Sequence, residues 1–155
     1  MKTKIYAAYG SNMNIDQMLM RCPRATNIGT ATLKNYKLTF RGGSRGVANI
    51  ERCIGREVPI VLWRITERCE ETLDVYEGFP RLYTKETIKV ENGLQGHKVT
   101  CMAYIMAQKY EAMPAMPMDY YYSTIAQGYE DHGIDLKTLD DAYSECYEET
   151  REGKE

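Results

Sequence analysis

The stretch KIYAAYGSN, residues 4–12, decides how the chain starts to fold. Lys4 to Tyr9 is rich in the residue types found in short strands, and Gly10-Ser11-Asn12 ends this strand with residues typical of turns. Asn14 then offers a side-chain oxygen that can cap a helix running through Met20. The sequence therefore predicts a strand, a polar turn and a helix in immediate succession.

Downstream of this unit, short β-rich runs alternate with breakers such as Gly42-Gly43-Ser44. The predicted strands are Thr26 to Thr32, Tyr36 to Phe40, Val47 to Glu51, Val58 to Ile65, Leu82 to Val90 and Lys98 to Met106, the last two joined by a loop containing Asn92-Gly93. Between them Thr66 is placed to cap a helix that ends at Glu77, with Gly78 as its terminator. A mostly antiparallel sheet with a helix inserted in it is expected.

The last third of the chain is predicted to be mainly helical. Met113 to Met118 contains two prolines and is expected to be a loop, and Tyr120 to Tyr129 and Lys137 to Glu149 are expected to be helices. Residues 150–155 are charged and are predicted to form a disordered tail. No repeat or linker is visible, so residues 1–149 are expected to form a single domain.

The overall composition favours a small-molecule partner. Hydrophobic residues make up 43% and charged residues 27%, and the net charge is -2. A chain so close to neutral has no general attraction for nucleic acid or anionic lipid. No stretch is long and apolar enough to span a membrane, and the first residues lack the features of a secretion signal.

Cysteine and histidine usage argues against a metal or disulfide framework. The five cysteines are scattered without a Cys-x-x-Cys pair, and only two histidines are present. Reduced thiols in a cytoplasmic protein are the expectation from this pattern. We therefore expect a site without metal or cofactor.

The turn Tyr9-Gly10-Ser11-Asn12-Met13 is the first candidate for a binding site. Glycine allows close approach to the backbone, and N–H groups near a helix N-terminus can hold a carboxylate or a polarised carbonyl. An ordinary turn followed by a cap explains the same residues. Local chemistry alone leaves both interpretations open.

Glu77 is the second candidate. It falls in the last turn of its helix, where the helix dipole disfavours a negative charge. Burial beside Tyr76 and Phe79 would add to this effect, and both influences raise a carboxyl pKa towards the range used in proton transfer. A solvated glutamate at the end of a helix is the competing interpretation.

Tyrosine is the third feature, since the chain has thirteen tyrosines but two phenylalanines and one tryptophan. Tyr83, Tyr104 and the run Tyr120-Tyr121-Tyr122 carry hydroxyls that could orient a polar ligand. Packing in half-buried strands accounts equally well for Tyr83 and Tyr104.

Taken in order, these residues resemble the γ-glutamylcyclotransferase family. The matching features are Tyr9-Gly10-Ser11-Asn12 after the first strand, Glu77-Gly78 followed by Pro80 and Tyr83, Cys101 to Met106 in a late strand, and the spacing of Pro117, Tyr121 and Gly128. The resemblance covers about residues 4–145, and the ordered set is more specific than any single motif. The segment from Glu77 to Tyr83 looks shorter than in animal members.

The resemblance implies an α+β fold, a small mixed and mostly antiparallel β-barrel with flanking helices. It also implies intramolecular cleavage of a γ-glutamyl amide to 5-oxoproline and a free amine, with Glu77 as general base and acid and no cofactor. The implied substrate-binding residues are Tyr9, Gly10, Ser11, Asn12, Met13, Tyr83, Tyr104 and Tyr121, with the choice among Tyr120, Tyr121 and Tyr122 depending on the alignment.

Two other functions stay open at this point. The pocket could bind a γ-glutamyl or amino-acid ligand without turning it over, or the same chemistry could act on a γ-glutamylated lysine or biosynthetic intermediate. The sequence does not identify the leaving amine, and a homodimer also stays open as an assembly.

Overall fold

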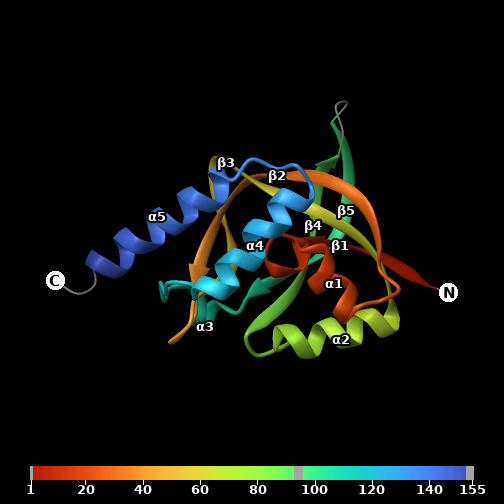
Figure 1. Cartoon of the computed structure of the whole chain (residues 1–155), viewed down its shortest axis with the longest axis horizontal. Coiled ribbons are helices and arrows are strands. Elements are labelled where there is room, and N and C mark those ends of the chain that lie inside the picture. Colours follow the sequence, from red (N-terminus) through yellow and green to blue (C-terminus); the bar gives the residue numbers. More distant parts are fainter. Residues whose placement is uncertain (1, 93–95, 153–155) are drawn as a thin grey trace.

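A closed five-stranded barrel forms the centre of the protein (Figure 1). The computed structural model describes residues 2–92 and 96–152. The strands are β1 (Thr3–Ala8), β2 (Thr26–Arg41), β3 (Val47–Thr66), β4 (Tyr83–Asn92) and β5 (His97–Met106). Their order around the barrel is β1-β3-β2-β4-β5, and β1 closes it by pairing in parallel with β5 while the other pairs are antiparallel. The predicted α+β barrel is confirmed.

The strands β2 and β3 are longer than the sequence suggested. The four short runs between residues 26 and 65 were expected to be separate strands, but they merge into two long ones. A register shift between Lys34 and Tyr36 joins the two halves of β2, with Asn35 in the left-handed region at φ 66°. Such an irregularity bends and twists a strand without ending it, which lets the long hairpin curve around the barrel.

The helix α2 (Glu67–Glu77) has the ends predicted for it. The Thr66 side chain accepts a hydrogen bond from the backbone N–H of Cys69 at 3.2 Å, and Gly78 ends the helix at φ 66°. Only a residue that tolerates positive φ fits this terminator, which explains the glycine. The position of Glu77 at the end of α2 is thus fixed by local sequence.

The remaining helices cover the barrel from several sides. A short 3-10 turn η1 (Ser11–Met13) leads into α1 (Ile15–Arg21), which lies near α2 in Figure 1. The helix α3 (Gln108–Glu111) was not predicted, and α4 (Asp119–Asp131) follows the expected proline-containing loop. Close packing of α4 on η1 requires Gly128, where a Cβ would lie 2.8 Å from Asn14 N.

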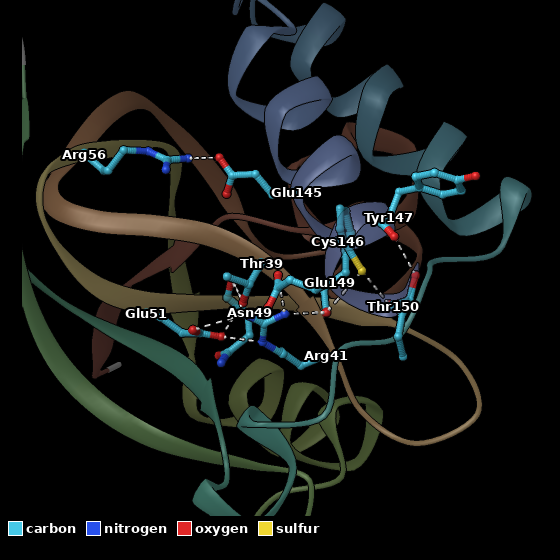
Figure 2. Close-up of polar contacts among 12 residues, drawn as sticks. Thr39, Arg41, Asn49, Glu51, Arg56, Glu145, Cys146, Tyr147, Glu149 and Thr150 are labelled. Atoms are coloured by element: carbon cyan, nitrogen blue, oxygen red, sulfur yellow. Dashed lines mark hydrogen bonds and ion pairs between the residues drawn. The ribbon is translucent and has the colours of Figure 1, made fainter. Parts of the chain in front are cut away.

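The last helix, α5 (Lys137–Glu152), packs on β2 and buries Leu139, Ala142 and Cys146, and ion pairs add to this contact. Arg41 is buried and pairs with Glu51 of β3 and Glu149 of α5, and Arg56 pairs with Glu145 (Figure 2). The helix runs three residues beyond its expected end at Glu149, so residues 150–152 of the predicted tail are helical. Residues 153–155 and Gly93 of the predicted β4–β5 loop lie outside the described residues.

Two of the five cysteines form a disulfide, so the expectation of reduced thiols was wrong. Cys22, which ends α1, is bonded to Cys69 in the first turn of α2, and the two are 47 positions apart in sequence. Cys53, Cys101 and Cys146 are free. The pairing was not visible in the sequence because the fold, and not a short spacing, brings α1 and α2 together.

Within the described residues no helix is long and apolar enough to cross a membrane.

Candidate active site

A cavity of about 230 Å³ opens where the turn after β1 meets the end of α2. The barrel contributes from β1, β3, β4 and β5, and α4 closes one side. The lining residues are Tyr6, Tyr9, Gly10, Ser11, Asn12, Val47, Ala48, Tyr76, Glu77, Leu82, Tyr83, Tyr104 and Tyr121. Apart from Met13, the structure therefore brings together every residue that the sequence suggested for the site.

Glu77 supplies the carboxyl group of this cavity. The residue as a whole is half-buried, and its Oε1 accepts a hydrogen bond from the Asn12 side-chain nitrogen at 3.3 Å. Removal of the carboxyl from water raises its pKa to about 7, although the positive charge of Arg21 acts in the opposite direction. A carboxyl with this pKa can exchange a proton at neutral pH.

The turn after β1 also lines the cavity and lies next to the end of α2. Ser11 Oγ lies 2.9 Å from the Tyr76 hydroxyl, which ties η1 to α2. Asn12 is almost completely buried, and its backbone carbonyl accepts a hydrogen bond from Trp63 Nε1 at 2.9 Å. Within the turn, the Met13 N–H donates to the Gly10 carbonyl at 3.0 Å and the Asn14 N–H donates to the Ser11 carbonyl at 3.1 Å, which fixes its backbone.

Met13 is placed differently from the expectation. Its side chain is fully buried in the hydrophobic core and does not line the cavity. Gly128 of α4 lies against it, since a Cβ at Gly128 would come within 2.8 Å of Met13 Cβ. The Met13 side chain supports the turn from behind, and the predicted role of Met13 in substrate binding stays a prediction.

The predicted tyrosines line the cavity, and hydrogen bonds hold their hydroxyl groups in place. Tyr9 donates a hydrogen bond to the Tyr104 carbonyl and Tyr83 donates one to the Ala48 carbonyl, while the Tyr104 hydroxyl donates to Asp74 at 2.6 Å. Burial raises the pKa of Tyr9, Tyr83 and Tyr104 above the usual value, so these hydroxyls stay protonated at neutral pH. The fixed hydroxyls position the rings around the cavity.

The structure also identifies which tyrosine of the run faces inward. Tyr121 lines the cavity, and its hydroxyl accepts a hydrogen bond from the Ala48 backbone N–H at 2.9 Å. Tyr120 is 76% exposed, and Tyr122 donates a hydrogen bond to Asp140 instead. The choice of Tyr121 from the resemblance agrees with this geometry.

Beyond Val47, Ala48 and Leu82 of the lining, sequence reasoning missed three polar side chains that contribute to the site. Tyr6 and Tyr76 line the cavity, and Arg21 contacts it indirectly through Asn12. Tyr6 lies three residues before Tyr9, and its place in the strand that leads into the turn is the sequence feature that points to it. Arg21 had no comparable signal, because a basic residue in the last turn of a helix is common for reasons of the helix dipole.

The arrangement offers proton-transfer chemistry. Among residues 2–92 and 96–152, no group of three or more His, Cys, Asp or Glu side chains is placed to hold a metal ion. The expectation of a cofactor-free site stays a prediction. A single carboxyl of near-neutral pKa, set among neutral hydroxyls and an amide donor, is suited to act as a general base and then as a general acid.

Comparisons with known proteins show which family this chain resembles. A family model described as "Gamma-glutamyl cyclotransferase, AIG2-like" matches residues 6–123. The human protein named Gamma-glutamylcyclotransferase is 32% identical over 143 residues, with 86% of this chain and 73% of the human protein covered. The mouse protein of the same name is 32% identical over 142 residues, with the same coverage. A solved structure of a protein called Gamma-glutamyl cyclotransferase superposes with a TM-score of 0.80 at 29% identity, covering 91% of this chain and 86% of that one.

Proposed function

Because the chain belongs to the γ-glutamyl cyclotransferase, AIG2-like family and is an enzyme of that type, we propose that Glu77 is the proton-transferring residue of its reaction. The substrate is a γ-glutamyl amide, and the products are 5-oxoproline and a free amine or amino acid. The turn of Tyr9, Gly10, Ser11 and Asn12 binds the glutamyl group. The tyrosine wall formed by Tyr83, Tyr104 and Tyr121 encloses it.

The reaction needs little from the protein beyond positioning and proton transfer. The α-amine of the substrate enters as an ammonium with a reference pKa of about 8, and Glu77 removes one proton from it. The nitrogen attacks the side-chain carbonyl carbon, and the carbonyl π electrons move to oxygen. When the tetrahedral intermediate collapses, the carbon–nitrogen bond to the departing amine breaks. The protonated Glu77 returns the first proton to the departing nitrogen as this bond breaks. The carboxylate then accepts the extra proton of the attacking nitrogen and passes it to the released amine or to solvent, which restores the ionised base.

Two properties of the cavity support this assignment: it can hold the reacting groups of the substrate close together, and its interior has low polarity. Holding the α-amine near the carbonyl in a closed space favours five-membered ring closure, because an intramolecular attack gains from fixed orientation. Backbone N–H groups of the turn are suited to the glutamyl carboxylate or the developing oxyanion. The low polarity that raises the pKa of Glu77 also strengthens these hydrogen bonds.

One observation carries the proposal. Glu77 lies in the cavity, its carboxyl has a pKa of about 7, and it accepts a hydrogen bond from Asn12 of the turn. A glutamate exposed to solvent at a helix end would have an ordinary pKa. The near-neutral value matches the requirement for a group that must both accept and return a proton near pH 7.

The test is to incubate the purified protein with a panel of γ-glutamyl amides and to measure 5-oxoproline. The panel should contain γ-glutamyl amino acids, a γ-glutamyl dipeptide, ε-(γ-glutamyl)lysine and neutral γ-glutamyl alkylamides. Release of 5-oxoproline from one or more of them is expected, and the preferred member identifies the leaving amine. Tight binding of these ligands without release would instead support the interpretation as a binding module.

A further inference from the structure

The side chain of Asn12 is held by hydrogen bonds on both its oxygen and its nitrogen. Its Oδ1 accepts from Arg21 Nη1 at 2.7 Å, and its Nδ2 donates to the Tyr6 hydroxyl at 2.9 Å and to Glu77 Oε1 at 3.3 Å. A guanidinium has donors only, so the atom of Asn12 that faces Arg21 must be the oxygen. The nitrogen is then forced to face Glu77.

The guanidinium of Arg21 is itself fixed from two further directions. Its Nη2 donates to Gln17 Oε1 at 2.8 Å, and its central carbon lies 3.7 Å from the centroid of the Tyr76 ring. Gln17 is one helical turn before Arg21 on α1, and Tyr76 is next to Glu77 on α2. A planar, permanently charged group that stacks and donates in several directions is well suited to this junction, and a lysine would reproduce only its charge and one bond.

Arg21 also differs in charge from the other groups around the Glu77 carboxyl. Within the described residues, the titratable groups that interact with this carboxyl are Arg21 from α1, Tyr6 and Tyr9 at the end of β1, Tyr83 from β4, Tyr104 from β5 and Tyr121 from α4. The tyrosines are neutral at pH 7, so Arg21 is the group in this set that favours the ionised carboxylate.

We infer that Arg21 is a positioning residue of the active site, which orients the Asn12 amide towards Glu77 and stabilises the carboxylate form of that base. This inference rests on the proposed role of Glu77. Arg21 does not line the cavity and needs no contact with substrate. Its effect passes through the hydrogen bond to Asn12 and through its charge. It tunes the pH at which the enzyme becomes active.

Three substitutions separate the two contributions. Arg21→Lys keeps a positive charge and one donor, Arg21→Gln keeps a donor without charge, and Arg21→Met keeps neither. We expect Arg21→Gln and Arg21→Met to move the pH midpoint of kcat upwards by roughly one pH unit, because an opposite charge nearby changes a carboxyl pKa by this order. Arg21→Lys should stay near the wild-type midpoint. Arg24→Met, at an exposed arginine three positions away, is the matched control.

The pKa of the Glu77 carboxyl should be measured directly as well, by infrared titration of the band that disappears in Glu77→Gln. This readout does not depend on turnover, and it stays informative if Glu77→Gln turns out to be active and the proposed function fails. An upward shift in Arg21→Gln with little change in Arg21→Lys would support the inference. An unchanged carboxyl pKa in folded Arg21→Gln, or an equal loss of rate in all three variants at every pH, would overturn it. If Arg21→Met does not fold, the Lys and Gln pair still decides the question.

Discussion

The Ser11 side-chain oxygen lies 2.9 Å from the hydroxyl of Tyr76, and this contact joins two segments that are 65 positions apart in sequence. Ser11 belongs to the turn that follows the first strand, and Tyr76 precedes the acid at the end of α2. Asn12 and Glu77, the next residue of each segment, make the parallel contact. The two segments therefore meet as a unit.

Glu77→Gln should reduce 5-oxoproline formation by at least about 100-fold, because general acid–base catalysis contributes on this order. Glutamine has almost the same size and can still contact Asn12, so the fold and the binding of 5-oxoproline should be retained. Turnover assays together with calorimetric binding measure the two effects. Glu71→Gln, at an exposed glutamate of the same helix, is the control. Turnover by Glu77→Gln at the wild-type rate would remove Glu77 from the mechanism.

The catalytic rate should rise with pH through the pKa of Glu77. The base is active only when ionised, and burial raises its pKa from 4.5 to about 7. The kcat should therefore fall about tenfold per pH unit on the acid side of pH 7, while binding of the glutamyl group changes less. Steady-state kinetics between pH 5 and 8 on folded protein checks this. A flat kcat over that interval would exclude Glu77 as the rate-controlling base.

The same carboxyl should make folding stability depend on pH. In the unfolded chain Glu77 ionises near 4.5, whereas in the folded protein it holds its proton up to about 7. Between these values the folded state binds more protons, so the wild type loses stability relative to Glu77→Gln as the pH rises, up to about 3 kcal/mol above pH 7. Urea unfolding of both proteins at pH 4, 5.5 and 7.5 measures the difference. A difference that does not change with pH would show that the folded protein leaves this pKa unshifted.

Gly10→Val should weaken ligand binding and turnover together. A Cβ at Gly10 would lie 3.2 Å from Ala48 Cβ and 3.6 Å from the Tyr121 hydroxyl, so the two further methyl groups of valine enter the cavity wall. Overpacking of about 1–3 kcal/mol corresponds to about fivefold to about 150-fold weaker binding. Gly43→Ala is the control, because its Cβ would meet open space. Normal affinity for 5-oxoproline in a folded Gly10→Val protein would mean that the turn is only structural.

Loss of the Cys22–Cys69 disulfide should destabilise the protein by about 4 kcal/mol. The bond closes a loop with a sequence separation of 47, and the chain-entropy relation gives this value for a loop of that length. Urea unfolding of the double variant Cys22→Ser, Cys69→Ser measures the effect. Cys53→Ser, at a free cysteine, should leave the midpoint unchanged. Equal midpoints for wild type and double variant would show that the bond adds no stability.

The amino-acid sequence by itself was enough for the local architecture and the ordered motif. Thr66 and Gly78 mark both ends of α2 through capping rules that act within a few residues, and they place Glu77 at the helix end. The turn from Gly10 to Asn12 is also encoded locally. These features depend on backbone conformation and near neighbours, which a sequence displays directly.

Only the tertiary structure decided how these pieces meet. The folded chain brings Asn12 to Glu77, and the placement of α4 turns Tyr121 rather than Tyr120 towards the cavity. The roles of Met13 in the core and of Arg21 behind Asn12 depend on packing between helices that are distant in sequence. Such contacts carry no local periodicity or spacing, because they form only when β1, α1 and α2 have been assembled around the same barrel.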